Sequence, residues 1–280
     1  MSSTLATIER PSLAQRLAMV VTDSVTITKR NVIKIRRVPD VLIFSTISPI
    51  MFVLLFAYVF GSAIQLDGTS YREFLIAGIF AQTVVFGATF TGLSLAEDMQ
   101  KGIIDRFRSL PMAPSAVLIG RTLADVVINV VSLVVMSLTG LVVGWRIRGS
   151  FLDAVLAYVL LLLFAYAISW IMAVVGLLVR APEVYNNASF MVIFPLTFIA
   201  NTFVPTQNLP TVLRVIADWS PVSAVTQAAR DLFGNVSPMG PSTDVWPMRH
   251  PVATTFLWIV VILAIFVPLA LRQYKRSVSR

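Results

Sequence analysis

Five polar residues recur along the apolar segment 115–144 at spacings that place them on one face of a helix. They span an arc of about 80° and are Arg121, Asp125, Asn129, Ser132 and Thr139. Polar side chains inside a membrane helix usually face a cavity, a hydrated path or a neighbouring helix. Arg121 and Asp125 are four residues apart, so they can pair. The stripe predicts either a partly hydrated face that contacts substrate or a second subunit, or a buried structural contact with Arg121 reaching the headgroups.

No arrangement of residues typical of an enzyme active site can be recognised. The chain has no cysteine and a single histidine, His250, which excludes thiolate catalysis, disulfides and cysteine-based metal sites. No carboxylate cluster or nucleophile–base pair is evident, so we expect no enzyme and no metal site. The phosphate-binding motif G-x-x-x-x-G-K-[ST] is absent from the sequence. We therefore expect no cofactor on this chain, and any process driven by ATP needs ATP and Mg²⁺ on a separate subunit.

The composition indicates a helical membrane protein. Of the 280 residues, 57% are hydrophobic and only 13% are charged, against about 25% charged residues in soluble proteins. Apolar stretches of about 20 residues recur, the length that crosses a bilayer as an α-helix. We expect an all-α polytopic protein with six transmembrane helices at 41–64, 74–96, 115–144, 151–179, 188–204 and 251–271. The net charge of +8 is attributed to loops that face anionic lipid, and not to nucleic acid binding.

Six spans place both termini on the same side of the membrane, and the basic residues select the side. With the termini inside, sixteen of the 22 Lys and Arg residues fall in inner segments. Cytoplasmic segments carry an excess of Lys and Arg, so we expect a multi-pass protein of the cell membrane with both termini cytoplasmic. The expected organisation is a tail and interfacial helix at 1–40, a transmembrane domain at 41–271 with an extracytoplasmic loop at 205–250, and a basic tail at 272–280.

The segment from Ser12 to Arg37 has the spacing of an amphipathic helix. Apolar side chains such as Leu17, Val21 and Val25 share about a third of the helical wheel, with basic side chains opposite. We interpret this segment as a helix lying in the membrane surface, with Lys and Arg toward the headgroups. The alternative is a soluble helix that packs against a partner.

A charged, helix-forming segment, Glu97–Pro114, separates the second and third apolar runs and must therefore lie in water. At about 100° per residue, one face carries Ile103, Phe107 and Leu110. The opposite face carries Lys101, Asp105 and Arg108. Pro111 and Pro114 are expected to end the helix. A helix tied to two spanning helices would let a cytoplasmic partner move the membrane part. The alternative is an interfacial helix without a partner.

The 205–250 loop also contains helical spacing. Apolar residues recur at helical intervals from 209 to 233, and Pro210 and Pro221 can each begin a helix. We expect two short helices joined near Trp219. Their apolar faces predict that they dip into the outer leaflet or cap the bundle; the alternative is a small cap of two surface helices.

The layout and two motifs resemble the membrane permeases of ABC type 2 exporters, in particular the daunorubicin-resistance-like drug export permeases of actinomycetes. The first motif, KGIIDRFRSLP at 101–111, is similar to the family's signature of glycine, acid, arginine and a closing leucine before proline. The second comprises FVP at 203–205, LP at 209–210, WSPV at 219–222 and AAR at 228–230. The resemblance covers nearly the whole chain.

The resemblance implies an assembly. Glu97–Pro114 would be a coupling helix seated in a groove of a separate ABC ATPase. The residues implied at this contact are Glu97, Asp98, Lys101, Gly102, Asp105, Arg106, Phe107, Arg108, Leu110 and Pro111. Two ATPase copies would join two permease copies, as a permease homodimer, and ATP binding would drive substrate outward. The outer segment would form re-entrant helices that contain Pro205, Pro210, Trp219, Pro221 and Arg230.

The implied function is export of a hydrophobic drug or lipid-like compound, with antibiotic resistance as one outcome. Related proteins also move lipid-linked glycans or polysaccharides, so the substrate class stays open. An ion-gradient transporter is a different class, for which Asp125 is the nearest candidate ion carrier. A membrane-embedded enzyme lacks catalytic residues here, and a scaffold predicts no substrate-stimulated ATPase in any complex.

Overall fold

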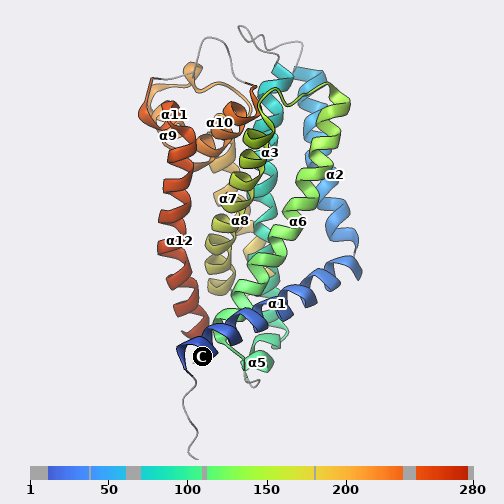
Figure 1. Cartoon of the computed structure of the whole chain (residues 1–280), viewed down its shortest axis with the longest axis vertical. Coiled ribbons are helices and arrows are strands. Elements are labelled where there is room, and N and C mark those ends of the chain that lie inside the picture. The colour runs from blue at the N-terminus through green and yellow to red at the C-terminus, as the bar shows by residue number, and fades with distance from the viewer. Residues whose placement is uncertain are drawn as a thin grey trace, which may run out of the picture.

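The computed structural model describes residues 12–37, 39–60, 71–108, 112–179, 181–235 and 244–276. Helices contain most of these residues, and no strand occurs in these ranges, which confirms the expected all-α class. The long helices form an elongated bundle, with α1 (Leu13–Arg37) lying across one end and three short helices at the other (Figure 1).

The remaining helices follow in chain order. The first half of the chain contains α2 (Pro39–Leu55) with a π-helical continuation (Phe56–Phe60), α3 (Tyr71–Gly87), α4 (Thr89–Gln100), α5 (Ile103–Arg108) and α6 (Pro114–Val143). The second half contains α7 (Phe151–Leu178), α8 (Pro182–Phe198), a 3₁₀ turn (Thr206–Asn208), α9 (Thr211–Asp218), α10 (Pro221–Phe233), α11 (Trp246–Arg249) and α12 (Pro251–Arg276). The largest packed group of buried residues joins α3, α7 and α10, so the short outer helix α10 belongs to the core of the bundle.

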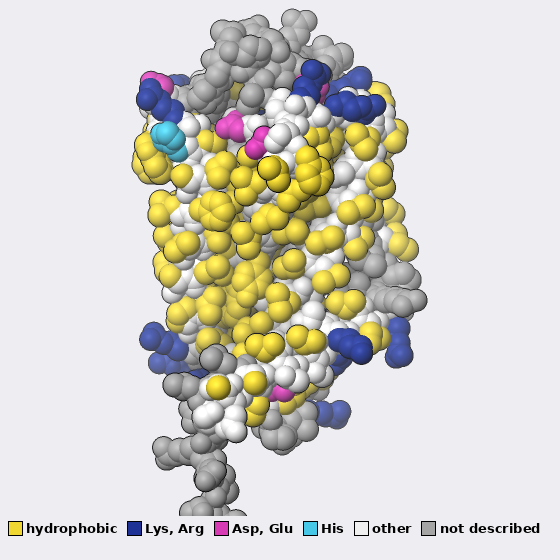
Figure 2. Space-filling view, viewed as in Figure 1, with side chains coloured by type: hydrophobic (Ala, Val, Ile, Leu, Met, Phe, Trp, Pro, Cys, Tyr) yellow, Lys and Arg dark blue, Asp and Glu magenta, His cyan; other side chains and the backbone are white. Residues whose placement is uncertain are grey.

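Within the described residues, four helical segments are long and apolar enough to cross a membrane: Tyr71–Gln100, Ser115–Val143, Phe151–Leu178 and Pro251–Arg276. The first of them combines α3 and α4. The other two expected spans correspond to shorter helices, α2 and α8, and part of the first expected span, 61–64, lies outside the described residues. On the face shown in Figure 2, a broad apolar band covers the middle of the bundle, and Lys and Arg gather beyond it at both ends. This pattern is typical of a protein embedded in a bilayer.

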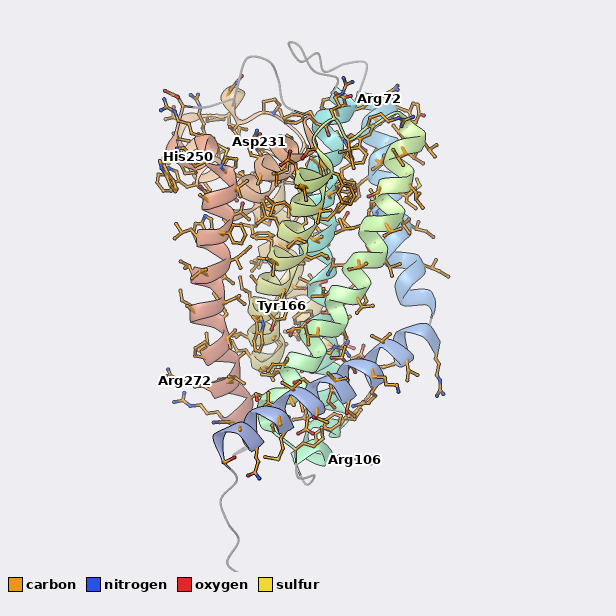
Figure 3. The ribbon with its side chains drawn as sticks, in the orientation of Figure 1. Arg72, Arg106, Tyr166, Asp231, His250 and Arg272 are labelled. Atoms are coloured by element: carbon orange, nitrogen blue, oxygen red, sulfur yellow. The ribbon has the colours of Figure 1, made fainter. Side chains whose placement is uncertain are left out.

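The two ends of the bundle contain different parts of the chain. Arg106 and Arg272 lie at the end crossed by α1, whereas Arg72, Asp231 and His250 lie at the opposite end (Figure 3). The segment between α4 and α6 therefore shares one end with α1 and with the C-terminal part of α12. The segment between α8 and α12 forms the other end.

The N-terminal helix α1 packs against α6 through a face that is partly polar. Ser24, Ile27 and Asn31 are buried, whereas Val21 and Val25 on the expected apolar face are 62% and 59% exposed. The helices meet at Gly120, where an added Cβ would lie 2.6 Å from the Ile27 Cβ. The apolar face predicted from the sequence thus stays available to lipid, and a neighbouring face contacts the protein.

Candidate functional site

The segment 97–114 forms the turn between α4 and α6, and it is not a single helix. Glu97 lies in the last turn of α4, and Lys101 and Gly102 then form a turn. Gly102 has φ = +64°, the left-handed conformation that favours glycine, and the helix is interrupted there. The expectation of one continuous helix over Glu97–Pro114 is therefore wrong, because a glycine in this conformation divides it.

The second part of this segment is the six-residue helix α5. Leu110 and Pro111 lie outside the described residues. Pro114 does not end the preceding helix as expected; it stands in the first turn of α6, where its missing N–H costs no hydrogen bond. The buried residue of α5 is Ile104, which packs in the cluster that contains Trp170.

The polar residues of this segment differ in exposure. Lys101 and Arg106 are exposed, and Asp98 is buried. The helical positions of Asp105 and Arg108 are described, but the placement of their side chains is not. Two of the predicted contact residues, Lys101 and Arg106, are thus on the surface at this end of the bundle.

Charged and aromatic side chains join this segment to α1. The Glu97 carboxylate lies 3.4 Å from the Lys101 ammonium and 4.0 Å from the Lys34 ammonium on α1. The Arg30 guanidinium stands over the Phe107 ring, 4.7 Å from its centroid. Each contact is partly exposed and weak alone. Together they connect α1, the end of α4 and α5 into one surface.

The polar stripe of α6 is buried and contacts α3 and α4. Asp125 is almost fully buried, and the Thr91 hydroxyl of α4 donates a hydrogen bond to its carboxylate. Asn129 donates to the backbone oxygen of Asp125 over 3.0 Å and packs against Gly87. The structure has no ion pair between Arg121 and Asp125, because the carboxylate faces Thr91 on the neighbouring helix. Nothing in the sequence pattern indicated Thr91 as the hydrogen-bond partner of Asp125.

The two residues at the far end of the stripe, Ser132 and Thr139, lie in different environments. Ser132 is buried and lines a cavity. The Thr139 hydroxyl donates to the Val135 carbonyl of its own helix over 2.9 Å, so it makes a local contact. The five residues therefore share a helix face without forming one continuous polar path.

At the opposite end, the predicted residue Arg230 makes several contacts. Its guanidinium donates to the carbonyl oxygens of Phe74 (3.0 Å), Asn201 (2.7 Å) and Thr202 (3.3 Å). It also lies 3.5 Å from the centroid of the Phe74 ring. Arg230 is 1% exposed, so this charge joins α10, α3 and the end of α8 inside the protein.

The other predicted outer residues have simpler roles. Pro221 is the first residue of α10, and Pro210 immediately precedes α9, so both helices begin as predicted. Pro205 precedes the 3₁₀ turn, and Trp219, between α9 and α10, is half exposed. The two short helices differ: α10 is buried among α3, α7 and α12, whereas most of α9 is exposed.

The comparison with known proteins identifies the family. The family model described as ABC-2 type transporter matches residues 22–233, from α1 to the end of α10. The chain belongs to this family. One relative is the daunorubicin resistance ABC transporter permease protein DrrB1 of Streptomyces coeruleorubidus. The chain is 33% identical to it over 268 residues, which cover 95% of this chain and 91% of the relative. It is 25% identical over 193 residues, 69% of this chain and 66% of the relative, to the doxorubicin resistance ABC transporter permease protein DrrB of Mycobacterium tuberculosis.

Membership of the ABC-2 family agrees with the arrangement of the bundle. The matched range includes both the α4–α6 connection at one end and α9–α10 at the other. The chain is thus a multi-helix membrane permease of the ABC-2 type, and these two relatives are named as drug-resistance transporters.

Proposed function

We propose that this chain is the permease subunit of an ATP-driven exporter that moves a hydrophobic, aromatic compound out across the cytoplasmic membrane. The observation that carries the proposal is the 33% identity over 95% of the chain to a permease named for daunorubicin resistance. The sequence has no phosphate-loop motif, so ATP and Mg²⁺ would bind a separate ATPase subunit. Lipid-like compounds and lipid-linked glycans are the alternative substrates for the same mechanism.

In this proposal two permease copies and two ATPase copies form the exporter. The chain crosses the membrane six times, with α2 and α8 as the two shorter crossings, and both termini are cytoplasmic. Lys and Arg are in excess at the end that would face the cytoplasm. The interfacial role of α1 and the re-entrant role of α9 and α10 belong to the same proposal.

The surface formed by α1, the end of α4 and α5 is the proposed ATPase contact. Lys101 and Arg106 are exposed there, and Phe107 is covered in part by Arg30. Both α4 and α6 continue from this surface into the apolar band. A displacement of the surface by ATP-dependent closure of the ATPase pair would therefore be passed directly to two membrane helices.

The test is co-purification of the permease with a co-expressed phosphate-loop ABC ATPase from the same genome. Lys101→Glu and Phe107→Ala should reduce both co-purification and drug-stimulated ATP hydrolysis, while the permease remains monodisperse in detergent. The matched control is Arg249→Glu, an exposed charge reversal at the opposite end of the bundle. Full export by membranes that contain no ATPase partner, or equal losses in all three variants, would refute the proposal.

A gradient-driven transporter is the second candidate, and one observation favours it. One carboxylate oxygen of the buried Asp125 has no hydrogen-bond partner among the described residues. An intramembrane carboxylate with a free oxygen is a typical ion or proton carrier. ATP-independent transport that depends on Asp125 would distinguish this candidate from the exporter.

A further inference from the structure

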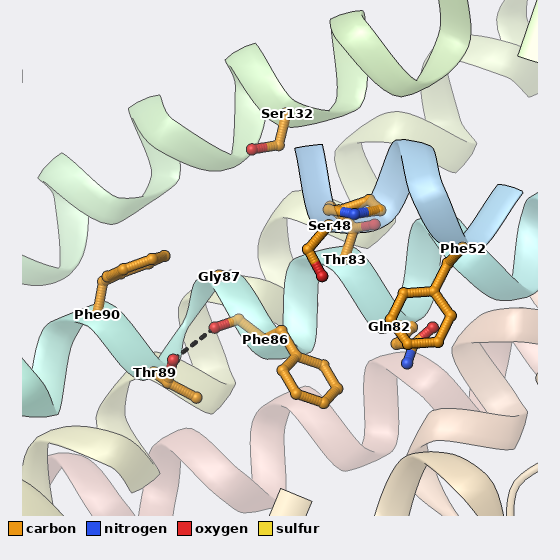
Figure 4. Close-up of a pocket in the computed structure, with 10 residues that line it drawn as sticks. Ser48, Phe52, Gln82, Thr83, Phe86, Gly87, Thr89, Phe90 and Ser132 are labelled. Atoms are coloured by element: carbon orange, nitrogen blue, oxygen red, sulfur yellow. Dashed lines mark hydrogen bonds between the residues drawn. The ribbon is translucent and has the colours of Figure 1, made fainter. Parts of the chain in front are cut away.

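A cavity of about 220 Å³ lies between α2, α3, α4 and α6 (Figure 4). Its apolar walls come from Phe52 on α2, Phe86 on α3, Phe90 on α4 and Pro49. The cavity is smaller than the roughly 300–1,000 Å³ of sites that enclose a whole drug-sized ligand. It could therefore enclose only part of such a compound.

Two buried polar side chains that line this cavity lack partners in the described part of the chain. The Gln82 amide and the Ser132 hydroxyl are 4% and 3% exposed, and neither makes a hydrogen bond to the protein there. Their polar atoms remain accessible from the cavity, so each has a hydrogen-bonding position that a bound molecule can reach. A ligand with hydroxyl or carbonyl groups would supply these bonds, whereas a lipid acyl chain would not.

A single turn residue, Ala88, separates α3 from α4 beside the cavity. Ala88 keeps helical dihedral angles, its N–H donates to the Val84 carbonyl (3.1 Å), and the flanking residues Gly87 and Thr89 both line the cavity. The Thr89 hydroxyl turns back to the Phe86 carbonyl (2.7 Å; Figure 4).

No Asp, Glu, Lys or Arg is among the described residues that line the cavity. Recognition here would therefore depend on ring stacking and on hydrogen bonds, and not on an ion pair. Phenylalanine rings favour flat aromatic partners, and cations gain a further attraction from the ring faces.

We propose that the cavity binds the planar ring system of the exported compound, a polycyclic aromatic molecule with hydroxyl or carbonyl groups. Phe52, Phe86 and Phe90 would contact the rings, and Gln82 and Ser132 would hydrogen-bond the polar groups. The inference rests on the proposed export function and deepens it, because it names the substrate class and the residues that select it.

The test measures binding of daunorubicin to the purified full-length permease, without ATPase, by the change in daunorubicin fluorescence. Phe86→Leu keeps an apolar side chain but removes the ring, and it should weaken daunorubicin binding about tenfold. The control Phe256→Ala removes an exposed ring of α12 outside the cavity and should change the Kd less than about twofold.

A second arm separates the polar groups from the rings. Gln82→Leu should weaken daunorubicin binding about tenfold and leave the binding of anthracene, which has no hydrogen-bonding group, nearly unchanged. If Phe86→Leu does not fold, the Gln82→Leu measurement still tests the proposal. The proposal is overturned if the wild type does not bind daunorubicin, if Phe256→Ala weakens binding as much as Phe86→Leu, or if Gln82→Leu alters neither probe. Displacement of daunorubicin by oleate with equal affinity in wild type and Gln82→Leu would identify an acyl-chain site instead.

The binding assay tests the cavity and the export assay tests the export function, so the two proposals can be rejected separately. Unchanged daunorubicin affinity in the cavity variants, together with intact ATP-driven export, rejects the cavity alone. Cavity-dependent binding in a permease that never couples to an ATPase rejects the export function alone.

Discussion

The Asp23 carboxylate of α1 accepts a hydrogen bond from the Ala113 backbone N–H, over 3.0 Å, at the residue that precedes α6. The first backbone N–H groups of a helix have no partner within it, and a carboxylate at this position is also favoured by the helix dipole. Ala113 has no side chain that can serve as the cap. A residue of the N-terminal helix therefore completes the start of the helix that contains the polar stripe.

The first prediction concerns this cap. Asp23→Ala should lower the stability of the permease by about 1 kcal/mol, because the Ala113 N–H loses its acceptor. For a chain of this size, the melting temperature in detergent should fall by about 2–4 °C. Asp23→Asn, which keeps an acceptor oxygen, should fall between wild type and Asp23→Ala. The exposed neighbour Thr22→Ala is the control, and an equal shift in it would show that the cap contributes nothing.

The second prediction concerns the crossing of α1 and α6 at Gly120. An added Cβ would lie 2.6 Å from the Ile27 Cβ and 2.8 Å from the Ser24 carbonyl oxygen, so Gly120→Val should push α1 away from α6. The natural chain has no cysteine, which makes single-cysteine labelling specific. The buried Ser24→Cys should react slowly with a soluble maleimide and at least about tenfold faster when combined with Gly120→Val.

Val21→Cys is the control for that experiment, because its side chain is already exposed. Its labelling rate should be the same with and without Gly120→Val. Slow labelling of Ser24→Cys in the Gly120→Val background would mean that α1 tolerates the larger residue and that the crossing is not close in solution.

The packing of α1 illustrates what the sequence could and could not predict. Helical periodicity was sufficient to predict α1 and its apolar face, including Val21 and Val25. It did not predict that Ser24 and Asn31 would be buried against α6. In a membrane protein, apolar side chains are equally stable against lipid and against protein, so polarity does not identify the protein-facing side. A small residue at the crossing, Gly120, is the better signal.

The candidate sites were predictable to different degrees. The prolines at 210 and 221 correctly predicted the beginnings of α9 and α10, because proline suits the first positions of a helix. The expected span 74–96 lies within the helical segment Tyr71–Gln100, as the apolar run predicted. The cavity beside this helix was not predicted. Gln82 and Ser132 line it from different helices, and no spacing within one helix can reveal that.

The third prediction concerns Arg230. Arg230→Met should destabilise the permease by on the order of 3 kcal/mol, because buried carbonyl oxygens of Phe74, Asn201 and Thr202 lose a charged donor. Arg230→Lys should also be destabilising, since an ammonium group cannot reproduce the flat fork that reaches several carbonyls. The measurement is thermal unfolding in detergent. Arg249→Met, which removes an exposed arginine, should unfold like wild type, and similar losses at both arginines would contradict a specific role for Arg230.

The last prediction separates the two candidate functions through Asp125. If the permease works by ATP-driven export, Asp125→Asn should retain most transport in ATP-loaded vesicles that contain the ATPase, because an amide oxygen can still accept the hydrogen bond from Thr91. A pH gradient alone should drive no transport in the wild type or in the variant. If the carboxylate is instead an ion carrier, the wild type should transport daunorubicin on a pH gradient without ATP, and Asp125→Asn should abolish that transport. Thr91→Val is the complementary control, since it removes the hydrogen bond that Asp125→Asn keeps, and it leaves the carboxyl group in place. A loss of transport in Asp125→Asn but not in Thr91→Val would therefore come from the loss of the titratable carboxyl group. That outcome would count against the exporter.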